Sequence, residues 1–130
     1  MPLKYLDHVN LRTADVARLS EFYSSVLGLQ LGARPAFSFG GAWLYCGERA
    51  VIHLVEVGEQ PTPSGALRME HFAFVADGFD EIVRRLEASA VEYRTSQLFG
   101  TTTRQLNLSD PDGNRLHIDF PDLAAAHLAK

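Results

Sequence analysis

The chain opens with two contrasting patterns of apolar residues. From Tyr5 to Arg12 apolar and polar positions alternate, as in a β-strand that is covered on one face. Between Val16 and Leu27 the apolar residues instead recur at helical spacing. Thr13 is the predicted N-cap of this helix, and Gly28 is predicted to end it. The start of the chain therefore predicts a strand followed by an amphipathic helix.

Short apolar runs separated by turn residues predict the strands that follow. In the first half they are expected at Leu29–Arg34, Ala42–Cys46 and Ala50–Val57, and the last two form a hairpin around Gly47. A polar, proline-bearing stretch at residues 58–65 then reads as a linker. The first half is thus predicted to be βαβββ.

The second half repeats this order. A strand is predicted at Glu70–Ala76, and a helix follows from about Gly78 to Ser89. The three remaining strands are predicted at Val91–Thr95, Thr103–Ser109 and Arg115–Phe120. Between the last two, Asp110–Gly113 is a strong turn signal.

A shift of 63 positions superimposes the two halves, placing His8 on His71 and the apolar positions of one helix on those of the other. The predicted fold class is α+β, with two tandem βαβββ modules whose curved mixed sheets surround a metal-binding cleft. The modules form a single domain: module one spans about 4–57, the linker 58–68, module two about 69–120, and a C-terminal tail 121–130.

Composition narrows the class of partner. The 130 residues are 46% hydrophobic and 22% charged, enough for one domain with a full core. The net charge of −4 gives no reason to expect nucleic acid or anionic lipid as a partner. Neither a signal peptide nor an apolar run of about 20 residues is visible, so a cytoplasmic protein without a membrane partner is expected. The single cysteine, Cys46, has apolar neighbours and is expected to be a buried structural thiol.

Four histidines are the strongest chemical signal in the sequence. Because side chains alternate across a strand, the helix of each module should cover the apolar positions and leave the histidines on the open face. The four are His8, His53, His71 and His117. Packed around a pseudo-twofold axis, the modules would bring them into one cleft, where a divalent metal would relieve their mutual repulsion. The alternative is that each is a separate structural or surface residue; His127, without a repeat partner, is assigned to the tail.

Several segments resemble the vicinal-oxygen-chelate proteins, the group that contains glyoxalase I, extradiol dioxygenases, fosfomycin-resistance enzymes and bleomycin-resistance proteins. The similar segments are Asp7–Asp15 and Glu21–Leu29 at the start, with Glu70–Phe74 and Asp110–His117 in the second half. The likeness covers nearly the whole chain. It implies paired βαβββ modules, a metal in the cleft, and a substrate that chelates the metal through adjacent oxygens.

Within this resemblance the four histidines are not equivalent. His8 and His71 match positions where the family places histidine ligands, whereas His53 falls where glyoxalase I-like members carry glutamate and some others carry no ligand. His117 departs from the pattern, because members usually have glutamate there. Asp119, on the same strand face, is the predicted catalytic base or a group that orients a histidine through its second nitrogen. A solvated strand-end carboxylate is the alternative.

An all-histidine site binds a cation without neutralising it, so it should favour an anionic chelating substrate. Fe(II) or Mn(II) is the favoured metal, with Zn, Ni and Co as alternatives. We expect a dioxygenase-like enzyme acting on a small molecule with vicinal oxygens. A glyoxalase-type lyase or isomerase is the first alternative, and a non-catalytic binding or resistance protein is the second.

Five further residues are predicted to bind substrate. Asn10 and Arg12 share a strand face with His8, and Arg12 would pair with an anion or lie at the rim. Trp43 and Tyr45 would form an aromatic wall, for which core packing is the alternative. Gln105 would bind a substrate oxygen if it faces the cleft.

A homodimer is expected, because the family pairs its modules either within one chain or between two chains. In the exchanged arrangement each metal would take His8 and His53 from one chain and His71 and His117 from the other.

Overall fold

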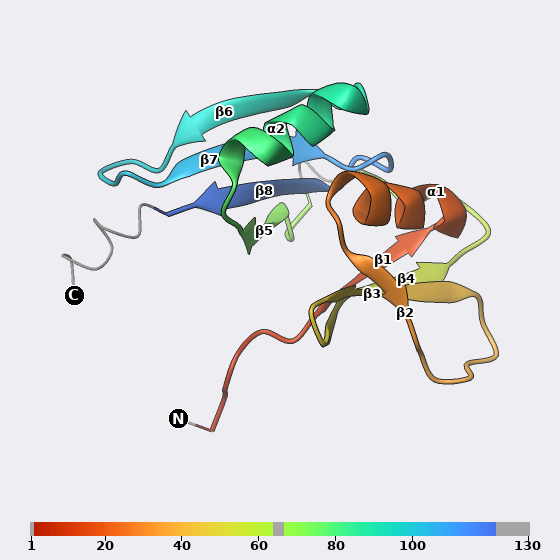
Figure 1. Ribbon diagram of the computed structural model, residues 1–130. Coiled ribbons are helices and arrows are strands. Elements are labelled where there is room, and N and C mark those ends of the chain that lie inside the picture. Colours follow the sequence, from red (N-terminus) through yellow and green to blue (C-terminus); the bar gives the residue numbers. More distant parts are fainter. Residues whose placement is uncertain (1, 64–66, 122–130) are drawn as a thin grey trace. The chain divides into compact units, whose positions relative to one another are not determined.

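Each half of the chain folds around its own four-stranded sheet in the computed structural model, which describes residues 2–63 and 67–121 (Figure 1). The chain divides into two units, residues 1–62 and 63–130, and the division falls within the predicted linker. His127 lies outside the described residues. Both units have the order strand, helix, three strands, which confirms the predicted pair of βαβββ modules.

The first unit contains β1 (Val9–Thr13), helix α1 (Val16–Glu21), which continues as a π-helical turn (Phe22–Val26), β2 (Gln30–Gly32), β3 (Gly41–Cys46) and β4 (Arg49–Glu56). Its strand order is β1-β4-β3-β2. The β1–β4 pair is parallel and the other pairs are antiparallel, so the sheet is mixed. Helix α1 packs against β3 and β4.

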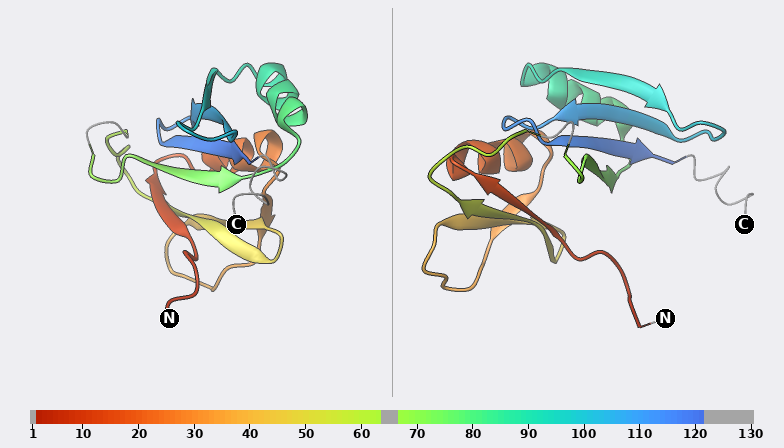
Figure 2. Two further views of the ribbon diagram at one scale, coloured as in Figure 1. Left: turned by 90° about the vertical axis from the view of Figure 1, so that its left-hand side faces the viewer. Right: turned by 180° about the vertical axis from the view of Figure 1, so that it is seen from behind.

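The second unit contains β5 (His71–Val75), helix α2 (Phe79–Ala88), β6 (Tyr93–Gln97), β7 (Arg104–Ser109) and β8 (Arg115–Phe120). Its strand order, β5-β8-β7-β6, corresponds to that of the first unit, with β5 and β8 parallel. Helix α2 lies along one face of this sheet in all three views (Figures 1 and 2).

The register of the parallel pairs places the histidines equivalently. Asn10 of β1 lies opposite His53 of β4, and Ala73 of β5 lies opposite His117 of β8. The repeat that relates His8 to His71 relates Asn10 to Ala73 by the same shift. The internal repeat therefore extends to the pairing of the central strands.

Burial alternates along the strands as predicted. In β4, Ile52 and Leu54 are each 1% exposed, whereas in β8 Leu116 and Ile118 are almost fully buried. His117, between the last two, is only partly buried, because it points to the opposite face. The apolar faces of both sheets therefore form the cores beneath the helices.

The first helix begins two residues later than a Thr13 cap would require. Asp15 is the N-cap, and its Oδ1 accepts a hydrogen bond of 3.0 Å from the backbone N–H of Arg18. Thr13 is the last residue of β1, fully buried, and its hydroxyl oxygen accepts the N–H of Asp15. Asp15 thus caps the helix directly, whereas Thr13 is the last residue of β1 and fixes the position of Asp15 through its backbone N–H.

The Asp110–Gly113 turn forms as predicted. The Oδ1 of Asp110, a residue only 4% exposed, accepts the backbone N–H groups of Asp112 and Asn114. Gly113 has φ +87°, a conformation that other residues rarely adopt. This turn fixes the start of β8, the strand that carries His117.

The expected burial of Cys46 is wrong, because its thiol is exposed. Cys46 is the last residue of β3 and precedes the turn that contains Gly47, which has φ +64°. No helix of the described residues is long and apolar enough to span a membrane.

Candidate metal and substrate site

His8 and His53 form a stacked pair in the first unit. Their ring centroids are 3.8 Å apart with an interplanar angle of 10°. His8 immediately precedes β1, and its Nδ1 lies 2.7 Å from the Oδ2 of Asp7. This contact lowers the pKa of the Asp7 carboxyl, because the hydrogen bond to His8 stabilises its ionised form. The paired carboxylate is therefore charged and accepts the Nδ1 proton of His8.

His53 is buried between two rings. Its other face stacks on Trp43 at a centroid distance of 3.9 Å, because the two residues are opposite each other in β4 and β3. Its Nε2 lies 3.1 Å from the carbonyl oxygen of Ala50, so Nε2 carries the proton that is donated there. Burial, and secondarily the neighbouring His8, lowers the pKa of the His53 imidazole. The folded environment of His53 therefore favours its neutral form.

The second unit brings His71 and His117 together in the same way. Their ring centroids are 4.7 Å apart and inclined at 44°. The Nδ1 of His71 lies 3.0 Å from Oε1 of Glu70, and the Nδ1 of His117 lies 2.6 Å from Oδ1 of Asp119. The side chains of His117 and Asp119 are 17% and 22% exposed, which makes this the best shielded of the three carboxylate–histidine contacts.

These contacts determine which nitrogen can bind a metal. A neutral imidazole carries one proton, so a ring that donates through Nδ1 presents a lone pair at Nε2. His8, His71 and His117 all donate through Nδ1 to a carboxylate, an arrangement typical of metal-binding histidines. His53 differs because its Nε2 is held by Ala50, which leaves Nδ1 as its lone-pair nitrogen.

Each unit by itself supplies one histidine pair. Within residues 2–63 and 67–121, no group of three or more His, Cys, Asp or Glu side chains is placed to hold a metal ion. The four-histidine site thus stays a prediction. The donor set suits a divalent transition metal, since imidazole nitrogen is a preferred ligand of such ions.

Two of these contacts were not predicted from sequence. Asp7 and Glu70 hold His8 and His71, yet both are exposed and were not assigned a role. The sequence did contain an indication of these contacts, because an acidic residue directly precedes the histidine at the same repeat position in both modules.

The predicted substrate residues of the first unit share the histidine face of its sheet. Asn10 and Arg12 are exposed and alternate with buried Leu11 and Thr13 on β1. Tyr45 is half-buried on β3, and its hydroxyl donates a 2.5 Å hydrogen bond to the carbonyl oxygen of Ala33. That bond ties the loop after β2 to the sheet.

Trp43 continues the ring stack toward this loop. Phe37 lies 6.4 Å from Trp43 and stacks on Phe39 at 4.8 Å. Phe37 and Phe39 are 42% and 44% exposed, so both rings lie outside the core. Arg34 lies over both phenyl rings, with its guanidinium carbon 5.0 and 5.4 Å from their centroids. Aromatic side chains therefore extend from His8 to Phe39 along one face.

Gln105 also reaches the histidine face, but its amide contacts Asp119. Its Nε2 donates a 3.1 Å hydrogen bond to the Oδ1 of Asp119, the atom that also accepts from His117. Gln105 and His117 are therefore linked through the Oδ1 of Asp119.

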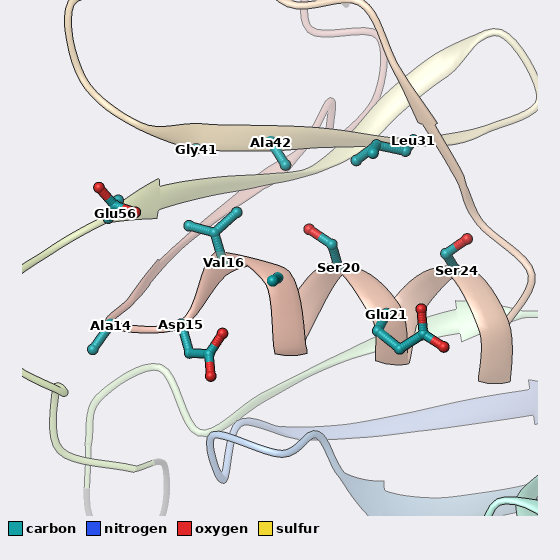
Figure 3. A pocket seen from close by; sticks show the side chains of 11 residues that line it. Ala14, Asp15, Val16, Ser20, Glu21, Ser24, Leu31, Gly41, Ala42 and Glu56 are labelled. Carbon is teal, nitrogen blue, oxygen red and sulfur yellow. The ribbon is translucent and has the colours of Figure 1, made fainter.

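Two hollows, one in each unit, lie away from the histidines. One, of about 650 Å³, lies between α1 and the strands that carry Leu31 and Ala42 (Figure 3). Another, of about 750 Å³, is lined by Phe79, Arg104 and Phe120 in the second unit. None of the predicted site residues lines either hollow. His117 lies on the sheet face opposite the buried Leu116 and Ile118.

Comparison with known protein families gives one match over most of the chain. The family described as the glyoxalase/bleomycin resistance protein/dioxygenase superfamily matches residues 5–118. A glutathione transferase, FosA from Serratia marcescens, is 30% identical over 126 residues, covering 95% of this chain and 85% of the relative.

Solved structures share the fold at lower identity. A lactoylglutathione lyase from Agrobacterium tumefaciens superposes with a TM-score of 0.71 at 21% identity, covering 95% of this chain and 98% of the other. A fosfomycin resistance protein, FosX from Listeria monocytogenes, has a TM-score of 0.72 at 16% identity, with the same coverage of both chains. At these identities the likeness concerns the fold.

Proposed function

Because this chain belongs to the glyoxalase/bleomycin resistance protein/dioxygenase superfamily, we propose that it is a divalent-metal enzyme acting on a small substrate that chelates the metal through adjacent oxygens. One observation carries the proposal. His8, His71 and His117 each donate Nδ1–H to a carboxylate, which directs an Nε2 lone pair toward a ligand.

In this proposal the histidines of both modules serve one metal, and His8, His71 and His117 are its ligands through Nε2. His53 is the predicted fourth ligand. Its contacts favour coordination through Nδ1, because Nε2 is bonded to Ala50, and its stacking on His8 supports a second role in holding that ring. Fe(II) or Mn(II) remains the favoured metal, and Zn, Ni and Co are the alternatives.

The bound cation would act as a Lewis acid and a template for the substrate oxygens. Around it, the protein would bind and orient the substrate. Arg12 would pair with an anionic substituent, and Asn10 would donate to or accept from a substrate oxygen. Trp43 and Tyr45 would exclude water from one side of the substrate. Asp119, predicted as a catalytic group, contacts His117 and is proposed to orient that ring by accepting its Nδ1–H.

Two reaction classes follow from different observations. The neutral ligand set keeps the full charge of the cation and favours a dianionic chelator such as a catecholate, which supports dioxygenase-like chemistry. The likeness to FosA supports transfer of glutathione to a small oxygen-rich substrate. Either substrate would use the same ligand positions.

The proposal is tested first by the metal content of the protein and then by its activity. Protein purified without chelators is analysed for metals, then loaded with Fe(II) or Mn(II). Oxygen uptake with catechols would support a dioxygenase-like activity. Glutathione consumption with fosfomycin would support a glutathione transferase activity. Isomerisation of hemithioacetals would instead support a glyoxalase-type lyase. Ligand binding without turnover would identify a binding or resistance protein.

The variant that tests the metal site is His71→Ala, and its control is Arg84→Ala at an exposed position of helix α2. Loss of metal from the first variant alone is expected. Equal metal content in His71→Ala and the unaltered protein would rule out the proposed site.

We also propose that the protein is a homodimer. Sedimentation velocity would test this, and a monomer at all protein concentrations would contradict it.

A further inference from the structure

A chain of side-chain hydrogen bonds crosses three strands of the second unit and ends on His117. Asn107 Nδ2 donates to Ser96 Oγ at 2.8 Å, and Ser96 Oγ donates to Gln105 Oε1 at 3.2 Å. Gln105 Nε2 donates to Asp119 Oδ1 at 3.1 Å. The same oxygen accepts the Nδ1 proton of His117 at 2.6 Å.

Strand register explains why these residues meet. Ser96 of β6 lies opposite Gln105 of β7, and Gln105 lies opposite Asp119 of β8, so the three form one row across the sheet. Asn107 lies opposite His117 in the neighbouring row on the same face. Side chains in such rows are close enough for direct contact.

Each link in the chain has a defined donor and acceptor. Asn107 donates to Ser96, so the Ser96 hydroxyl is free to donate onward to Gln105. The carbonyl oxygen of Gln105 is thereby used, and its NH₂ group is left to face Asp119. A carboxylate only accepts, so the proton between Asp119 and His117 belongs to the ring.

We infer that Gln105 is a positioning residue, which fixes Asp119 and through it holds His117 in the tautomer with Nδ1 protonated and Nε2 available to a metal. The inference deepens the proposed function and rests on it for the role of the metal. This role differs from the predicted one of direct substrate contact, because the oxygen and the nitrogen of the Gln105 amide are both already hydrogen-bonded within the protein.

The arrangement gives His117 a support that the other ligands lack. Asp7 and Glu70 have side chains that are 69% and 56% exposed, whereas that of Asp119 is 22% exposed and is held from a second strand. A partly buried and anchored carboxylate keeps its orientation better than a solvated one. His117 should therefore be the most firmly oriented of the three rings.

The test compares the tautomer of His117 in Gln105→Leu and in the unaltered protein. Histidines are labelled with ¹⁵N, and long-range ¹H–¹⁵N correlation spectra of the metal-free protein are recorded at about pH 8.5, where imidazoles are neutral. In the unaltered protein Nδ1 should show the protonated-nitrogen shift. In Gln105→Leu both nitrogen shifts should move toward averaged values, and Mn(II) or Zn(II) affinity should fall by roughly tenfold.

Gln97→Leu is the matched control. It removes a side-chain amide from the neighbouring strand β6. There Gln97 donates to the carbonyl oxygen of Thr101 and is not part of the hydrogen-bond chain that ends on His117. Gln105→Glu, which keeps the size of the side chain but replaces the donor with an acceptor, should reproduce the tautomer change.

The two claims fail in different ways. An unchanged His117 tautomer in both folded Gln105 variants would overturn the positioning role, whatever the metal data show. Absence of metal binding by the unaltered protein would overturn the proposed function, and the tautomer comparison would still decide the role of Gln105.

Discussion

The imidazole of His53 stacks on the indole of Trp43, with ring centroids 3.9 Å apart and the planes inclined at 13°. Since His8 covers the opposite face of His53, a predicted metal ligand is enclosed between a second ligand and the aromatic wall. The stack joins the two predicted parts of the site within one sheet.

This enclosure predicts a pH dependence in the metal-free protein. Burial, followed by the proximity of His8, lowers the pKa of His53 below its ordinary value of 6.5. The unfolded chain therefore binds a proton at His53 more readily than the folded one does. The contribution of the neutral ring is fully present above pH 6.5 and is lost as the pH falls toward the lowered pKa.

Trp43 provides the measurement, because it is the single tryptophan of the chain. Its fluorescence should change with the protonation of the stacked His53, with a midpoint below 6.5. The free energy of unfolding from urea titrations should decrease over the same pH range. His53→Phe keeps a ring in the stack and should abolish both effects. A midpoint above the ordinary histidine pKa would contradict the prediction.

Removing the charge of Asp119 should weaken metal binding more than removing that of Asp7. In Asp119→Asn a shielded partner of His117 is lost, and a decrease in Mn(II) or Zn(II) affinity of roughly 10- to 100-fold is expected. In Asp7→Asn the lost partner is exposed and screened by water, so the decrease should be smaller. Isothermal titration of both variants measures the difference, and equal losses would contradict it.

A side chain at Gly113, in the turn before β8, should destabilise the protein. A Cβ there would lie 2.7 Å from the Cβ of Pro63, in addition to the strain of a positive φ. Gly47 has φ +64° but open space around it, so Gly47→Ala should cost only the conformational strain, about 1–2 kcal/mol. Gly113→Ala should cost more than this in urea-induced unfolding. A smaller cost at Gly113 would show that the contact with Pro63 is readily relieved.

The core beneath the second helix depends on Leu116. This side chain is 2% exposed, so Leu116→Ala should leave a cavity and lower the free energy of unfolding by about 2–5 kcal/mol. Leu98, at 46% exposure, is the control, and Leu98→Ala should change stability by less than about 0.5 kcal/mol. Similar losses in both variants would argue against the assigned core.

The sequence by itself determined the two βαβββ modules and the pairing of histidines within each. Periodicity was sufficient because a covered sheet face requires strict alternation, and the shift of 63 positions related one half to the other. The last strand was predicted at its observed limits, Arg115–Phe120, because a glycine-containing turn precedes it. The start of the first helix was displaced, since Thr13 and Asp15 are both acceptable caps by residue type.

Only the tertiary structure decided what each site residue contacts. Hydrophobic patterning fixes the face on which a side chain lies, but cross-strand register decides its neighbours. That register places Trp43 opposite His53 and Gln105 opposite Asp119. Trp43 therefore stacks on an imidazole ring, whereas Gln105 donates a hydrogen bond to a carboxylate. The tautomers of the histidines follow from those neighbours, because a proton is placed by the acceptor that faces it.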